Sequence, residues 1–174
     1  MKPRLSLAVQ YGVAPGRLPS PASLRRFARA AVERDAAVTL RFVGKREGRT
    51  LNALYRGKEY PTNVLAFAYD GSPRVHGDIV LCAPVVRDEA KAQGKTVEAH
   101  CAHLVVHGML HLQGYDHGTA REARVMEARE TALLAGLGVS DPYAVTLRLT
   151  TPTLTPFAAP RGGAPAPLGR PCGR

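Results

Sequence analysis

Three histidines, spaced four and then six residues apart, form the strongest chemical motif of this 174-residue sequence. His107 and His111 are about one helical turn apart, so on an α-helix their rings project from the same face. Gly114 predicts the end of that helix, because glycine accepts the left-handed conformation of a helix C-terminus. The chain can then turn and bring His117 to the same point. Three neutral imidazoles that leave one coordination position for water or substrate are typical of a catalytic zinc site.

The spacing matches the long zincin motif H-E-x-x-H-x-x-G-x-x-H with one exception. Gly108 stands where the zinc peptidases carry the glutamate that acts as general base. The pattern therefore predicts a metal site that lacks the base of peptide hydrolysis. Zinc is the expected metal, although imidazole ligands also suit nickel, copper and iron. Asp116 and Asp78 are candidate bases, and the sequence neither chooses between them nor requires that either one serves.

Two further histidines, His100 and His103, precede the motif on the same face of the predicted helix. His103 and His107 are also four residues apart, which offers a second register for a metal site. Six residues beyond His107, however, lies Gln113, and no glycine is placed to turn the chain back. We therefore expect His100 and His103 to pack in the core or to orient a ligand or a carboxylate through a ring N–H group.

The length and composition are those of one globular domain with a hydrophobic core: 45% of the residues are apolar and 22% are charged. No run approaches the ~18 apolar residues of a membrane span, and the N-terminal residues do not resemble a signal peptide. We therefore expect a cytoplasmic protein. The three cysteines are scattered and form no C-x-x-C pair, so they predict neither a disulfide framework nor a metal cluster.

Positive charge is concentrated at the start of the chain. The net charge is +10, and residues 1–50 alone contribute +8. A basic segment of this kind suits a polyanionic partner such as RNA, because Lys and Arg that neutralise phosphates release counterions. A solvated, arginine-rich surface explains the same charge equally well.

Periodicity and turn residues predict four strands and five helices between residues 4 and 143. The predicted strands are residues 4–11, 37–43, 64–69 and 77–83, of which the last two form a hairpin. The predicted helices are residues 21–34, 46–55, 84–93, 97–113 and 119–134. The histidine helix is apolar nearly all round, so we expect it to be central and buried. Residues 144–174 are rich in Pro and Gly and basic, and we expect a disordered tail there.

The segment from His107 to His117 resembles the signature of the YbeY family, the bacterial endoribonucleases of ribosomal RNA maturation. Tyr55 to Lys58 and Pro61 to Phe67 resemble that family's second characteristic segment. The stretch from Gly77 to Cys82 is similar to its third. The three segments occur in the family's order, and the resemblance covers about residues 4–143.

The resemblance implies an α+β fold in a single domain, with a mixed sheet of about four strands covered by helices and a metal in a cleft. It implies a single-strand-specific endoribonuclease that processes the 3′ end of 16S rRNA and takes part in ribosome quality control. The expected partners are RNA and the small ribosomal subunit. Carried over by position, His107, His111 and His117 would bind one Zn2+ ion, and Arg56 would be a functionally required arginine.

Two other functions fit parts of the sequence. One is a metallohydrolase acting on a peptide or another small substrate, against which Gly108 stands. The other is a non-catalytic ribosome-assembly factor in which zinc is structural and the basic surface binds rRNA. The favoured hypothesis is hydrolysis of an RNA phosphodiester, with Arg56 stabilising the charge that develops on phosphate. Direct attack by water leaves a 5′-phosphate, whereas attack by the ribose 2′-hydroxyl leaves a cyclic phosphate.

Overall fold

A four-stranded mixed sheet covered by helices forms the described part of the chain, which in this computed structural model comprises residues 1–70 and 73–144. The elements follow the order β1 (Leu5–Tyr11), α1 (Pro21–Ala31), β2 (Ala36–Val43), α2 (Lys45–Arg56), β3 (Val64–Ala68), β4 (Val75–Cys82), α3 (Ala83–Ala92), α4 (Val97–Leu112) and α5 (Ala120–Gly136). This confirms the predicted α+β class. The tail predicted for residues 144–174 lies, from residue 145 on, outside the described residues, as does Cys172.

The strand order is β1-β2-β4-β3. Strands β1, β2 and β4 are parallel, and edge strand β3 runs antiparallel to β4. The predicted hairpin of β3 and β4 is therefore confirmed, and its ladder continues into a hydrogen bond of 2.8 Å from Tyr69 N to His76 O. Within that hairpin, Gly71 and Ser72 lie outside the described residues.

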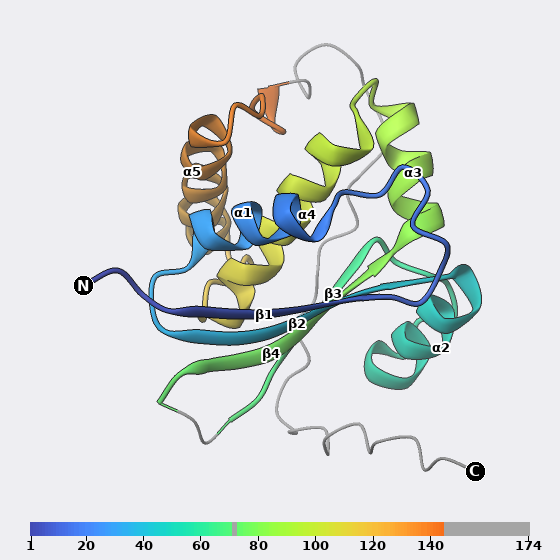
Figure 1. The fold of residues 1–174 in the computed structure, drawn as a ribbon, viewed down its shortest axis with the longest axis horizontal. Coiled ribbons are helices and arrows are strands. Elements are labelled where there is room, and N and C mark those ends of the chain that lie inside the picture. Colours follow the sequence, from blue (N-terminus) through green and yellow to red (C-terminus); the bar gives the residue numbers. More distant parts are fainter. Residues whose placement is uncertain (71–72, 145–174) are drawn as a thin grey trace.

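The helices divide unequally between the two faces of the sheet. In Figure 1, α1, α3, α4 and α5 lie on one side of the strands and α2 lies on the other. The alternation of β4 explains how one strand serves both layers. Ile79 and Leu81 belong to the main core beneath α4, whereas Val80 and Cys82 join a smaller cluster that includes Leu51 of α2.

Helix α4 is the buried centre of the molecule, as its apolar composition predicts. The hydroxyl oxygen of Thr96 accepts a hydrogen bond of 3.0 Å from Ala99 N and caps the helix at the predicted residue. The helix contacts α1, α3, α5, β3 and β4. Its last turns therefore hold any functional side chain in a rigid setting.

Several boundaries differ from the sequence prediction because tertiary contacts end or extend the elements. Helix α1 ends at Ala31 and not near Arg34, and the N–H group of Glu33 donates to Gln113 Oε1 at 2.7 Å. Strand β4 begins at Val75, two residues before the predicted start, because Val75 N donates to Asp35 O at 2.8 Å.

Within the described residues, none of the helices has the length and apolar character needed to cross a membrane.

Candidate metal centre

The rings of His107 and His111 lie side by side on the last turns of α4. Their Nε2 atoms are 3.1 Å apart, and the ring centroids are 4.6 Å apart. The ring of His117, from the turn after α4, lies 5.6 Å from that of His107 and 4.9 Å from that of His111. One nitrogen from each ring falls within 4.8 Å of the other two. The prediction that the three rings converge is confirmed.

A left-handed residue brings His117 back to the helix. Gly114 has φ +98°, its N–H group donates to His111 O at 3.0 Å, and Tyr115 N donates to Leu110 O at 3.1 Å. These two bonds form the Schellman motif, for which glycine is suited because it lacks a Cβ atom. The predicted end of the histidine helix is thus correct to within one residue, and its geometry determines where His117 lies.

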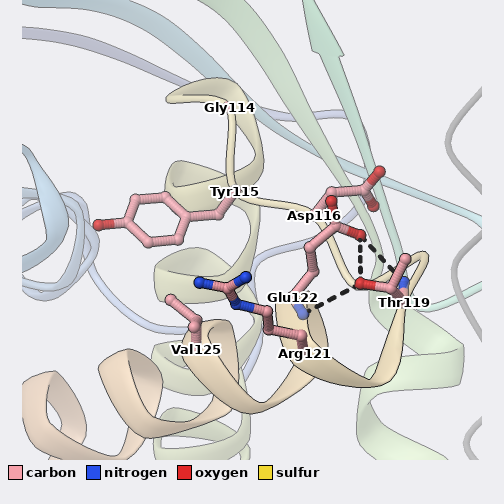
Figure 2. A pocket seen from close by; sticks show the side chains of 7 residues that line it. All are labelled: Gly114, Tyr115, Asp116, Thr119, Arg121, Glu122 and Val125. Atoms are coloured by element: carbon pink, nitrogen blue, oxygen red, sulfur yellow. Dashed lines mark hydrogen bonds between the residues drawn. The ribbon is translucent and has the colours of Figure 1, made fainter.

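Contacts on both sides hold this turn in place. The Gln113 side-chain amide donates to Ala31 O at 2.8 Å and accepts from Glu33 N, which fastens the end of α4 to the end of α1. Beyond His117, Thr119 and Glu122 form a reciprocal capping box at the start of α5 (Figure 2). The turn and the first turns of α5 line a pocket of about 400 Å3.

The geometry of the trio fits a tetrahedral metal ion. Two nitrogens bound to zinc at about 2.0–2.1 Å lie roughly 3.3 Å apart, close to the 3.1 Å between the two Nε2 atoms. Burial, together with the neighbouring rings of His107 and His117, lowers the pKa of His111 to about 3. His111 is therefore neutral near pH 7 and keeps the lone pair that a metal ligand needs. Among the described residues, no fourth His, Cys, Asp or Glu joins this group.

Close packing against the sheet explains the glycine in the middle of the motif. A Cβ atom at Gly108 would lie 3.0–3.2 Å from three carbon atoms of the Ile79 side chain. Gly108 thus faces β4, and a glutamate there would meet Ile79 instead of reaching water. The packing of α4 on the sheet and the presence of a peptidase base at this position exclude each other.

We expect Gly108→Glu to unfold the domain rather than to create a peptidase. An uncompensated buried charge lowers the free energy of unfolding by about 3–5 kcal/mol, which urea denaturation measures. The control is Gly136→Glu in α5, where a Cβ atom meets nothing within 4 Å. That change should alter stability by less than about 1 kcal/mol. Equal stability of the two variants would contradict the packing argument.

Comparisons with known proteins agree with the motif. Residues 23–138 match the model of a family described as "Endoribonuclease YbeY", a span that includes all three histidines and Arg56. The chain belongs to the YbeY family. A protein named Endoribonuclease YbeY from Aromatoleum aromaticum is 56% identical over 144 residues, which covers 81% of this chain and 94% of that protein. One of the same name from Methylibium petroleiphilum is 51% identical, with 82% of this chain and 97% of that protein covered.

The two carboxylates considered as bases in this YbeY-family chain lie in different places. Asp116 directly precedes His117, and its Oδ1 atom accepts a hydrogen bond of 2.7 Å from His117 N, so it shapes the turn. Asp78 accepts a hydrogen bond of 2.5 Å from the Tyr69 hydroxyl. Since Ile79 packs on α4, the alternation of β4 directs Asp78 to the opposite face of the sheet. Of the two candidates, only Asp116 lies at the histidine trio.

Arg56, the other residue carried over from the YbeY family, is the last residue of α2. It is half-buried, and this burial lowers the pKa of its guanidinium group below the usual value. Its neighbour Tyr55 packs against Phe67 of edge strand β3, with 4.8 Å between ring centroids. Arg56 therefore belongs to the helix on one face of the sheet, whereas His107 and His111 belong to α4 on the other face, and His117 follows in the turn after α4 (Figure 1).

Glu130 lies beside the trio and was not identified from the sequence. It lies on α5, is 0% exposed, and its Oε1 atom is 2.6 Å from His107 Nδ1. His103 Nε2 lies 3.0 Å from its Oε2 atom, so the ring of His103 is placed to orient this carboxylate. His100 instead meets Glu89 at 2.7 Å and is a buried core residue. The four-residue spacing of Met126, Glu130 and Leu134 places them on one helix face. A buried acid between two apolar residues needs a polar partner, and this pattern could have indicated Glu130.

Proposed function

We propose that this chain is a metal-dependent endoribonuclease that cleaves single-stranded RNA at a site built on one zinc ion and Arg56. The observation that carries the proposal is the convergence of His107, His111 and His117, found in a chain of the YbeY family. The names of its relatives supply the reaction class, because each is called an endoribonuclease. The donor set, three neutral imidazoles, supplies the choice of zinc.

Each group at the site has a task in phosphodiester cleavage. When bound, zinc acts as a Lewis acid and makes water a stronger acid near neutral pH. The three histidines hold the ion at one point beside the turn that follows α4. Arg56 contributes a charged guanidinium, which binds two phosphate oxygens at once and stabilises the charge that develops on them. Asp116, held by His117 N, orients the third ligand.

The positions of α2 and α4 on either side of edge strand β3 favour a flexible single strand as substrate (Figure 1). Strand β3 forms the edge of the sheet, α4 contacts it from one face, and Tyr55 packs on its Phe67 from the other. A single RNA strand that crosses this edge reaches both Arg56 and the metal. A stiff A-form duplex presents its phosphates on a wide cylinder and follows such an edge poorly.

The partner proposed is ribosomal RNA of the small subunit, encountered in the cytoplasm, where 3′-end maturation of 16S rRNA and ribosome quality control take place. The basic first third of the chain supports an RNA partner. Exposed arginines line α1, and Arg34 donates to Gln113 O at 3.2 Å, which places positive charge beside the end of the histidine helix. The wider surface therefore attracts the substrate that the metal centre cleaves.

A peptidase is disfavoured by a specific contact, because the position of its base is occupied by Gly108 packed on Ile79.

A cleavage assay distinguishes the proposed nuclease from a non-catalytic assembly factor. The purified protein, stripped of metal and reloaded with zinc, is incubated with a single-stranded fragment from the 3′ end of 16S rRNA and with the same sequence in a duplex. We expect zinc-dependent cleavage of the single strand alone. Binding of both RNAs without cleavage would support the assembly factor. Where the RNA is cleaved, the end groups of the products identify the attacking oxygen.

A further inference from the structure

Glu130 is a buried carboxylate with a full set of hydrogen-bond donors. Its Oε1 atom lies 2.6 Å from His107 Nδ1, and its Oε2 atom lies 3.0 Å from His103 Nε2 and accepts a short hydrogen bond from the Tyr143 hydroxyl. The side chain is 0% exposed. A carboxylate in such a place is tolerated only when donors replace the lost water. The three donors come from α4 and from the segment after α5, so several parts of the fold converge on Glu130.

The chemistry of the contacts shows which group carries each proton. Glu130 is 0% exposed and is surrounded by three groups that can each donate a hydrogen bond, two ring nitrogens and a hydroxyl. A carboxylate that accepts from all three places the proton of the His107 ring on Nδ1. The lone pair of a neutral His107 then lies on Nε2, and this is the atom 3.1 Å from His111 Nε2.

His103, His107 and Glu130 could in principle form a second metal site, since their donor atoms also lie close together. The distances disfavour it. Two ligands of one tetrahedral zinc ion lie roughly 3.3 Å apart, whereas His107 Nδ1 and Glu130 Oε1 are 2.6 Å apart. That separation is a charge-assisted hydrogen bond with no room for an ion between the atoms.

We propose that Glu130 is the positioning residue of the metal centre, fixing His107 in the Nδ1–H tautomer with its Nε2 atom aimed at the ion. The proposal rests on the proposed metal site. Glu130 does not act as general base, because it is buried and both its oxygens are occupied. His103 and Tyr143 hold the carboxylate in turn, so the ring of His107 has one orientation before metal binds. Hydrogen-bond partners of this kind raise the basicity of the ligand and fix the orientation of its ring, so less conformational entropy is lost when metal binds.

The first test needs no metal and no activity. Nitrogen-15 NMR of the metal-free protein, labelled at histidine, distinguishes a ring protonated at Nδ1 from one protonated at Nε2. We expect the Nδ1–H form for His107 in the wild type. In Glu130→Gln the amide has a single accepting oxygen for three donors, so His107 should shift toward a mixture of tautomers. A wild-type His107 protonated at Nε2 would overturn the proposal.

The second test is zinc affinity, measured by competition with a chromogenic chelator. Glu130→Gln should bind zinc roughly 10- to 100-fold more weakly, the usual effect of losing such a partner. Tyr143→Phe removes one of three donors and should have a smaller effect in the same direction. The control is Glu127→Gln, since Glu127 lies exposed on the same helix and should leave the affinity unchanged.

The outcomes separate this proposal from the proposed function. A folded Glu130→Gln with wild-type zinc affinity overturns the positioning role, whatever the nuclease activity. If Glu130→Gln does not fold, the wild-type tautomer and Tyr143→Phe still decide the question. A wild-type protein that has the Nδ1–H tautomer but neither binds zinc nor cleaves RNA would contradict the proposed function. Glu130 would then orient His107 without any role in metal binding.

Discussion

Replacing His111 by alanine should abolish both zinc binding and RNA cleavage. His111 contributes one of three converging nitrogens, and the two that remain cannot hold the ion against water. Loss of a residue that merely orients a ligand costs roughly 10- to 100-fold, so loss of a ligand should reduce kcat/KM by more than about 100-fold. Metal analysis of the purified variant and cleavage of the single-stranded rRNA fragment measure the two effects together.

His76→Ala provides the matched control, because His76 is exposed on β4. A surface histidine away from the site should change the rate by less than about twofold. Circular dichroism and thermal unfolding of metal-free samples show whether His111→Ala keeps the fold. Equal cleavage by His111→Ala and wild type, once contaminating nuclease is ruled out, would refute a catalytic metal centre.

Arg56→Ala should slow cleavage while zinc stays bound. Removing one group that stabilises developing charge typically costs about 10²- to 10³-fold in kcat, and Arg56 belongs to α2, which supplies no metal ligand. Single-turnover cleavage measures the chemical step, and zinc content should remain at one ion per chain. The effect on KM should be smaller, because the other basic residues still attract RNA.

The control for this change is Arg46→Ala, an exposed arginine on the same helix. It removes the same charge from α2 without touching the end at which Arg56 lies. We expect a modest loss of affinity that disappears at higher salt, with kcat intact. Identical kinetics of the two variants would show that Arg56 contributes only net charge.

Local patterns in the sequence predicted most of the fold. The period of α4, the cap at Thr96 and the left-handed turn at Gly114 are properties of short segments, and each was found where expected. The hairpin of β3 and β4 followed from two short apolar runs joined by turn residues. The convergence of His107, His111 and His117 needed only one helix and one turn, which is why spacing alone could predict it.

Contacts between distant segments could not be predicted from these local patterns. The N–H group of Glu33 bonds to Gln113, 80 residues away, and this contact accompanies the early end of α1. Glu130 meets His107 across two packed helices, so its role depends on how α5 lies on α4. Asp78 was a reasonable base by its place at a strand end, but the pleat of β4 directs it away from the histidines.

X-ray absorption at the zinc edge of the purified protein tests the metal centre most directly. We predict one zinc ion per chain, with three imidazole nitrogens and one light non-protein ligand at roughly 2.0–2.1 Å. The spectrum of His111→Ala, if any metal remains, should show fewer imidazole contributions. A protein that retains no stoichiometric metal, or a shell of four protein donors as in a structural site, would contradict the catalytic centre proposed for His107, His111 and His117.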